Sequence, residues 1–82
     1  MRATVHIRPK SGILDPQGEA VRDSLDKLGF PVESARVGRL VDLDLATDDA
    51  VEARAQVERM CAELLANPLI ESVEIEIAEE RS

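Results

Sequence analysis

Aromatic residues are almost absent from this sequence, which has one phenylalanine and neither tyrosine nor tryptophan among 82 residues. Modules that bind single-stranded nucleic acid stack the bases on aromatic side chains, and this chain offers almost none. The net charge of -7 at pH 7 also repels phosphate backbones and anionic membrane surfaces. We therefore expect neither nucleic acid nor a membrane among the partners of this protein.

Cysteine and histidine, two frequent catalytic and metal-binding residues, occur once each, as Cys61 and His6. One cysteine cannot form an internal disulfide, and no cysteine or histidine spacing fits a zinc site. Cys61 falls in the apolar stripe of a predicted helix, which favours a buried, inert thiol. His6 lies among arginines on a predicted strand, which favours a surface role over catalysis. We therefore expect no catalytic residue, cofactor site or metal site in this chain.

Long apolar runs are also missing. None approaches the roughly 20 residues that span a bilayer, and the first eight residues alternate polar and apolar side chains, unlike a signal peptide. Together with the single cysteine, these features favour a reducing, cytoplasmic setting. The composition is 44% hydrophobic and 33% charged, which is typical of one globular domain, here residues 1–82. A domain this short buries only roughly 60% of its unfolded surface, so we expect it to oligomerise.

Three segments alternate apolar and polar side chains, as half-buried strands do: residues 3–8, 35–45 and 73–77. The middle segment is either one long strand or two strands that meet near Gly38. Arg39 occupies an inward-facing position there, so a local irregularity is needed to turn its side chain outward. Residues 79–82 follow the last strand, and we expect them to be frayed.

Two further segments have the apolar spacing of amphipathic helices. The first begins at Asp15-Pro16, because aspartate suits the N-cap and proline the first helical position, and it ends at Gly29. The second begins after Asp49, which has the spacing of a capping box with Glu52, and it ends at Asn67-Pro68. For Asn67 we expect either a left-handed backbone or a side chain that satisfies loose helix carbonyls.

The element order predicts an α+β fold of the form β-α-β(β)-α-β, with two helices on one face of an antiparallel sheet, related to the ferredoxin-like pattern. If the first strand is central, its outward cations Arg2 and Arg8 face acidic residues on both neighbours. These acidic residues are Asp42, Asp44, Glu74 and Glu76. Such pairs select the strand order more than they add stability.

Gly12 and Gly18 flank the start of the first helix, where an anion can bind. No dinucleotide-binding or P-loop pattern accompanies them, and Asp15 places a carboxylate where a phosphate would sit. The residues therefore favour a capped turn over a phosphate site. From the residues alone, the chain is a small acidic α+β domain without an active site of its own.

Several short runs are together similar to one family, from about residue 5 to residue 77. The runs are Pro9-Lys10, residues 12–18, Leu28-Gly29, residues 36–39, Met60-Cys61 and residues 64–71. Their order and spacing resemble those of PurS, the small subunit of phosphoribosylformylglycinamidine (FGAM) synthase. Arg39 departs from the lysine that is usual in the family, and Ser72-Val73 stands where an aromatic residue is common.

The resemblance implies a non-catalytic subunit of a ligase complex in purine biosynthesis. The complex converts formylglycinamide ribonucleotide, ATP and glutamine to the amidine. The small subunit bridges a synthetase subunit (PurL) and a glutaminase subunit (PurQ), and is thought to help pass ammonia between them. It forms a homodimer or a dimer of dimers, and ATP and Mg are expected on the synthetase subunit rather than on this chain.

The family runs gather at loops and helix ends, where binding residues tend to lie. We therefore expect six residues to lie on or shape the surfaces that meet partner subunits: Lys10, Asp15, Gln17, Gly18, Arg39 and Asn67. An alternative of another class is a small dimeric sensor domain that binds an amino acid or nucleotide at its dimer seam. An independent small enzyme has little support, because His6 and Cys61 both have structural explanations.

Overall fold

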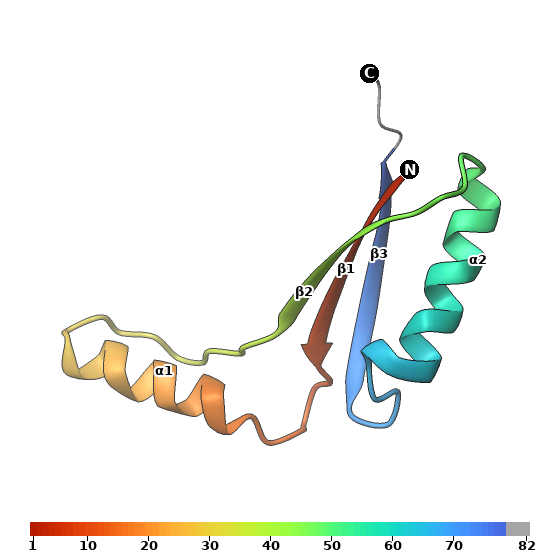
Figure 1. Ribbon diagram of the computed structural model, residues 1–82. Coiled ribbons are helices and arrows are strands. Elements are labelled where there is room, and N and C mark those ends of the chain that lie inside the picture. The colour runs from red at the N-terminus through yellow and green to blue at the C-terminus, as the bar shows by residue number, and fades with distance from the viewer. Residues whose placement is uncertain (79–82) are drawn as a thin grey trace.

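The computed structural model describes residues 1–78, which form a three-stranded antiparallel sheet and two helices (Figure 1). Along the chain, the elements are β1 (Arg2–Pro9), α1 (Pro16–Lys27), β2 (Arg39–Asp44), α2 (Ala50–Met60), a π turn (Cys61–Leu65) and β3 (Glu71–Ala78). The predicted α+β class and antiparallel sheet are therefore confirmed. The expected fraying of residues 79–82 lies outside the described residues.

β1 is the central strand of the sheet, in the order β2-β1-β3. Its alternating side chains Ala3, Val5 and Ile7 are at most 1% exposed, and they face α2. Val57 and Cys61 supply the buried side chains on the helical side of this small core. Complete burial of a valine or isoleucine contributes about 1.5–3 kcal/mol, so β1 is the strand on which the domain depends most.

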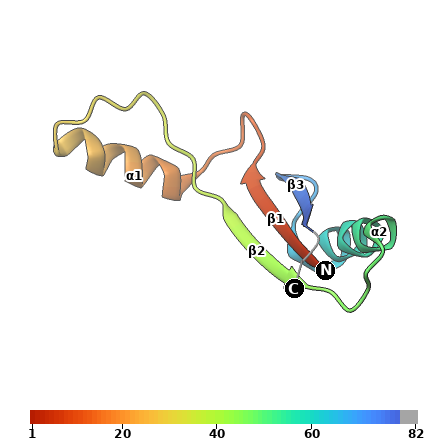
Figure 2. The same cartoon turned by 90° about the horizontal axis from the view of Figure 1, so that it is seen from above.

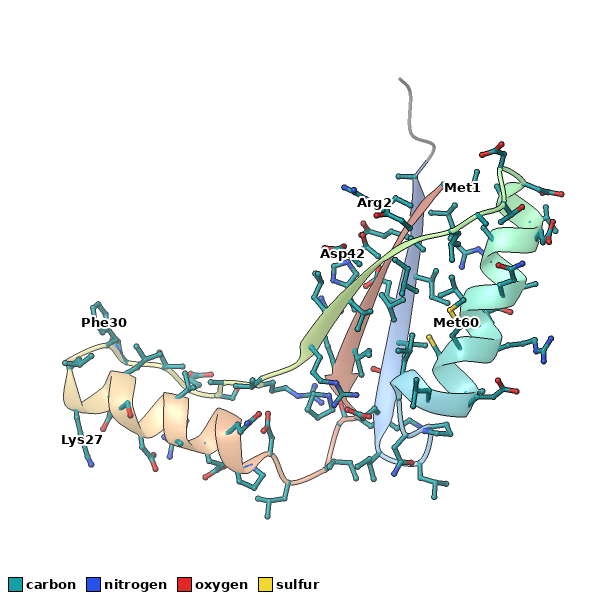
Figure 3. All side chains as sticks on the ribbon, in the orientation of Figure 1. Met1, Arg2, Lys27, Phe30, Asp42 and Met60 are labelled. Atoms are coloured by element: carbon teal, nitrogen blue, oxygen red, sulfur yellow. The ribbon has the colours of Figure 1, made fainter. Side chains whose placement is uncertain are left out.

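The outer face of the sheet carries the charge pairs that the sequence predicts for a central first strand. Arg2 Nε lies 3.3 Å from Asp44 Oδ1 on β2, and Arg8 Nη1 lies 3.3 Å from Glu74 Oε2 on β3. Between them, the Thr4 hydroxyl donates to Asp42 Oδ1 at 2.9 Å. Figure 3 shows the Arg2 and Asp42 side chains on this face, away from α2. The predicted charge complementarity across the strands is confirmed.

β2 is shorter than the predicted segment, because it begins only at Arg39. Residues 35–38 are irregular, and no second strand forms among them. Gly38 lies against the end of β1, where a Cβ would overlap the carbonyl oxygen of Ile7. This close backbone approach fixes where pairing with β1 begins, so the predicted long strand or hairpin is corrected to one six-residue strand.

α1 does not cover the sheet. It projects from the end of β1, and in the described part of the chain it packs against no strand and not against α2 (Figures 1 and 2). We call residues 10–38, which comprise α1 and its two connections, the arm. The expectation that both helices lie on one face is therefore not met within this chain, because extended connections carry α1 away and only α2 packs on the sheet.

The C-terminus of α1 ends as the sequence predicts. Gly29 has a φ of +95°, and the N–H of Phe30 donates to the carbonyl of Leu25 at 3.0 Å. These contacts form a Schellman cap, which a glycine completes without the steric cost of a Cβ. Figure 3 shows Lys27 and Phe30 at the far tip of the arm, where Phe30 is 57% exposed.

At the start of α2, one of the two hydrogen-bonding directions of the predicted capping box is present. Asp49 Oδ1 accepts hydrogen bonds from the N–H groups of Val51 and Glu52. The Glu52 carboxylate does not return to the N–H of Asp49, because the Thr47 hydroxyl accepts that bond and also donates to Glu52 Oε2. The helix therefore begins where the sequence predicts, but Thr47 takes the place of Glu52 as the partner of the Asp49 N–H.

Candidate functional site at the root of the arm

Arg39 joins the start of β2 to the segment that precedes β3. Its Nη1 lies 2.8 Å from Glu71 Oε2, and its Nη2 lies 3.2 Å from Glu71 Oε1. The same Nη2 donates to the carbonyl of Leu65 at 2.8 Å. Arg39 thus keeps its inward-facing register opposite Ile7, and its guanidinium reaches past the end of β1 to β3. The local irregularity predicted to turn the Arg39 side chain outward is unnecessary, because its guanidinium pairs with Glu71 of the same chain.

Asn67 fixes the other side of the Glu71 carboxylate. Its N–H donates to Glu71 Oε1 at 2.8 Å, and its side-chain Oδ1 accepts from the N–H of Leu69 at 3.0 Å. This is an Asx turn. No non-glycine residue described has a positive φ, and no described hydrogen bond joins the Asn67 side chain to a helix carbonyl, so both predicted alternatives for Asn67 are corrected to this turn. The hydrogen bond from Asn67 and the Arg39 guanidinium lower the pKa of Glu71.

Lys10 anchors the same turn from β1. Its Nζ donates to the carbonyl of Pro68 at 2.6 Å, and its N–H donates to the carbonyl of Ile70 at 2.9 Å. Lys10, Arg39 and Asn67, which lie far apart in the sequence, therefore meet around residues 65–71. The structure brings these three predicted site residues together at one end of the sheet.

Asp15 joins the two connections of the arm. One carboxylate oxygen accepts from the N–H of Gly18 at 3.0 Å, and the other accepts from the N–H of Val37 at 2.8 Å. The bond from Val37, followed by that from Gly18, lowers the pKa of Asp15. The N-cap predicted from the sequence is confirmed, and the same carboxylate also holds the returning chain beside the start of α1.

Gly18 is buried where the returning chain crosses α1. A Cβ there would overlap the carbonyl oxygen of Ala35 and lie 2.7 Å from Asp15 Oδ2. Gln17, the preceding residue, is exposed, and its side chain makes no hydrogen bond with another described residue. Asp15, Gln17 and Gly18 thus form a second group at the base of α1, apart from the group around Asn67.

Arg36 connects the two groups, and sequence reasoning did not include it among the site residues. Its guanidinium donates to the carbonyl of Pro9, so the returning connection is fastened to the end of β1. Glu71 was missed as well. Its signal was present in the sequence, because Arg39 and Glu71 both occupy inward-facing strand positions, where a charge needs an opposite partner.

Cys61 lies in the core of the domain, as its place in the apolar stripe predicts. Cys61 is 5% exposed, and its burial raises the pKa of the thiol. Within residues 1–78, no three histidine, cysteine or acidic side chains gather closely enough to hold a metal ion. None of the described helices is both long enough and apolar enough to cross a membrane.

Comparison with known proteins places the whole of this architecture in one family. The family model of PurS, described as phosphoribosylformylglycinamidine (FGAM) synthase, matches residues 2–79. The PurS subunit of Methanocaldococcus jannaschii is 35% identical over 77 residues, which cover 93% of each chain. The PurS subunit of Synechocystis is 40% identical over 77 residues, covering 93% of this chain and 75% of that protein.

The solved structures agree. The crystal structure of Methanocaldococcus jannaschii PurS has a TM-score of 0.87 at 33% identity and covers 98% of both chains. A chain in the structure of PurLQS from Thermotoga maritima has a TM-score of 0.83 at 29% identity, covering 92% of this chain and 93% of that one. Because residues 2–79 match the family model and the fold matches solved PurS structures, this chain belongs to the PurS family of FGAM synthase subunits.

Proposed function

We propose that this chain acts as the non-catalytic small subunit of an FGAM synthase complex and bridges its synthetase and glutaminase subunits. The observation that carries the proposal is the likeness over nearly the whole chain to a PurS protein within the PurLQS assembly of Thermotoga maritima. The complex would use ATP and glutamine to amidate formylglycinamide ribonucleotide. ATP and Mg would bind to the synthetase subunit, and the complex would work in the cytoplasm.

The shape of the chain favours assembly with other chains. Its radius of gyration is 16.1 Å, whereas a compact domain of this length has about 12 Å. Its accessible surface is 6159 Å², whereas a folded monomer of this mass exposes about 4,900 Å². The arm contributes to this extended shape, because α1 packs against no strand and not against α2 (Figure 1).

A second copy of the chain is the natural occupant of this surface. Apolar side chains are exposed along the arm: Leu14, Val21, Leu28 and Phe30. The face of the sheet beside α2 is also incompletely covered, because Val41 and Leu43 on β2 stay partly exposed. A homodimer or a dimer of dimers would bury both surfaces, and the six predicted contact residues at the root of the arm would then meet the partner subunits.

Reconstitution tests the bridging role. The tagged chain is mixed with a synthetase and a glutaminase subunit of an FGAM synthase, and glutamine-dependent FGAM formation is measured with and without the chain. We expect co-purification of all three and strong loss of glutamine-dependent activity when the chain is left out, while activity with free ammonia is retained. Equal glutamine-dependent activity without the chain would contradict the proposal.

A further inference from the structure

A hollow of about 460 Å³ lies where the arm meets the sheet. It is bordered by the end of β1, the returning connection and the start of β2. Its charged or titratable lining residues are Arg8, Arg36, Arg39 and His6, and no carboxylate lines it. The chain has 17 acidic and 10 basic residues, so this local excess of positive charge opposes the overall balance.

Besides Arg8, two lining residues of the hollow have acidic partners, because Arg39 pairs with Glu71 and His6 Nε2 lies 3.3 Å from Glu76 Oε1. Arg36 makes no ion pair with a described residue: its guanidinium is bound to the neutral carbonyl of Pro9, and its charge helps to lower the pKa of Asp15. Arg8 pairs with Glu74, but their side chains are 60% and 64% exposed, so water weakens that pair. An incoming anion can therefore compete for both guanidinium groups with little loss of existing interactions.

The arrangement fits a phosphate group better than a carboxylate. One carboxylate accepts one two-pronged guanidinium contact, whereas a phosphate presents three or more oxygens to donors from several directions. Arg8 on β1 and Arg36 on the returning connection approach the hollow from two different segments, while Arg39 beside them stays paired with Glu71. The volume also lies within the range of small-molecule sites, which leaves room for a group attached to the phosphate.

We propose that this hollow binds the phosphate group of a small molecule, such as a nucleotide or a sugar phosphate, at the root of the arm. An anion held between Arg36 on the arm and Arg8 on the sheet would fasten the arm to the sheet. Neither Arg8 nor Arg36 is among the six predicted contact residues, so this proposal and the proposed function can fail independently.

NMR titration of the full ¹⁵N-labelled chain tests the site. Inorganic phosphate, pyrophosphate and ATP without Mg are added in turn at constant ionic strength, with sodium chloride as the reference. We expect saturable shifts of the backbone amides of residues 6–10 and 36–40. Arg36→Gln should weaken binding by about tenfold, because it removes a charge-assisted contact.

Two further variants keep the result interpretable. Arg8→Gln removes a second guanidinium from an exposed position and should also weaken binding by about tenfold, even if Arg36→Gln unfolds. Arg59→Gln removes the same charge from α2, where Arg59 is 80% exposed, and should leave binding unchanged. Equal losses in all three variants, or shifts that sodium chloride reproduces, would overturn the proposal. Binding of a polyglutamate peptide but of none of the phosphates would also overturn it.

Discussion

Arg39 and Glu71 form a two-pronged ion pair that closes the end of the sheet, with N–O distances of 2.8 and 3.2 Å. The pair joins the start of β2 to the start of β3, although β1 lies between them. The Arg39 side chain is 56% exposed but that of Glu71 only 16%, so the carboxylate of this pair is better shielded from water than the carboxylate of Glu74 on the outer face, which is 64% exposed.

We predict that Arg39 and Glu71 stabilise the fold as a unit. Arg39→Ala and Glu71→Gln should each lower the thermal midpoint by a few degrees, and the double variant should lose less than the sum of the two. Calorimetry of the three variants measures this coupling. The matched control is Arg59→Ala with Glu63→Gln, an exposed pair 3.8 Å apart, which should show almost no coupling. Equal coupling energies for the Arg39–Glu71 pair and the Arg59–Glu63 pair would contradict the prediction.

Gly18→Ala should destabilise the arm, although alanine is normally the better helix former. The added methyl group would overlap the carbonyl of Ala35, so the returning connection must move away from α1. We expect a loss of about 1–3 kcal/mol in the free energy of unfolding, measured by urea denaturation. Ser24→Ala, at an exposed position of the same helix, should be neutral or slightly stabilising. An unchanged Gly18→Ala protein would show that the connection tolerates displacement.

Stability should fall in acid through Asp15 and Glu71. Both carboxyl groups have a pKa below the ordinary values of 3.8 and 4.5, so folding favours their ionised forms. Their contribution is complete above about pH 5 and is lost as the pH falls through the lowered values. Asp15→Asn and Glu71→Gln should therefore flatten the decline of the unfolding free energy between about pH 5 and about pH 2.

Urea denaturation at a series of pH values measures this slope. Asp48→Asn is the control, because the exposed Asp48 side chain accepts no hydrogen bond from the described residues. That variant should keep the slope of the unaltered protein. A slope that stays unchanged in Asp15→Asn and Glu71→Gln would show that other carboxyl groups control the acid response.

Assembly should depend on the apolar stripe of α1. Val21→Lys places a charge in the stripe and should weaken self-association by about 10- to 100-fold, because burial of a valine contributes about 1.5–3 kcal/mol. Light scattering coupled to size-exclusion chromatography over a range of concentrations measures this change. Asp23→Lys introduces the same side chain on the opposite side of α1 and should leave the oligomer intact. Dissociation by both variants alike would point to net charge rather than the stripe.

Substitution of Lys10 tests whether the predicted contact residues matter in the assembled complex. Lys10→Ala should reduce glutamine-dependent FGAM formation by the reconstituted complex by about tenfold, because the turn at residues 66–70 loses the Nζ bond to the Pro68 carbonyl and keeps only the backbone bond to Ile70. Lys27→Ala, at the tip of the arm, is the matched control for the loss of one lysine. Full activity and complex formation in Lys10→Ala, and also in Arg39→Ala, would reject this set of contact residues.

The sequence by itself determined the local structure of this protein. Alternating apolar residues located the three strands, although not the start of β2, and Asp15, Asp49 and Gly29 located helix ends, because capping depends on neighbours within a few residues. It was also consistent with a central first strand, because the cations of β1 would then face acidic residues on both neighbours, as they do. It further indicated the loops at which most of the candidate contact residues lie.

Only the tertiary structure decided where the arm goes and how the site is assembled. Periodicity shows that α1 has an apolar face, but it does not show whether the same chain or another covers that face. The ion pair between Arg39 and Glu71 and the hydrogen bond from Val37 to Asp15 join residues 32 and 22 positions apart. Such contacts depend on strand register and on the path of the connections, which the packing of the whole chain sets.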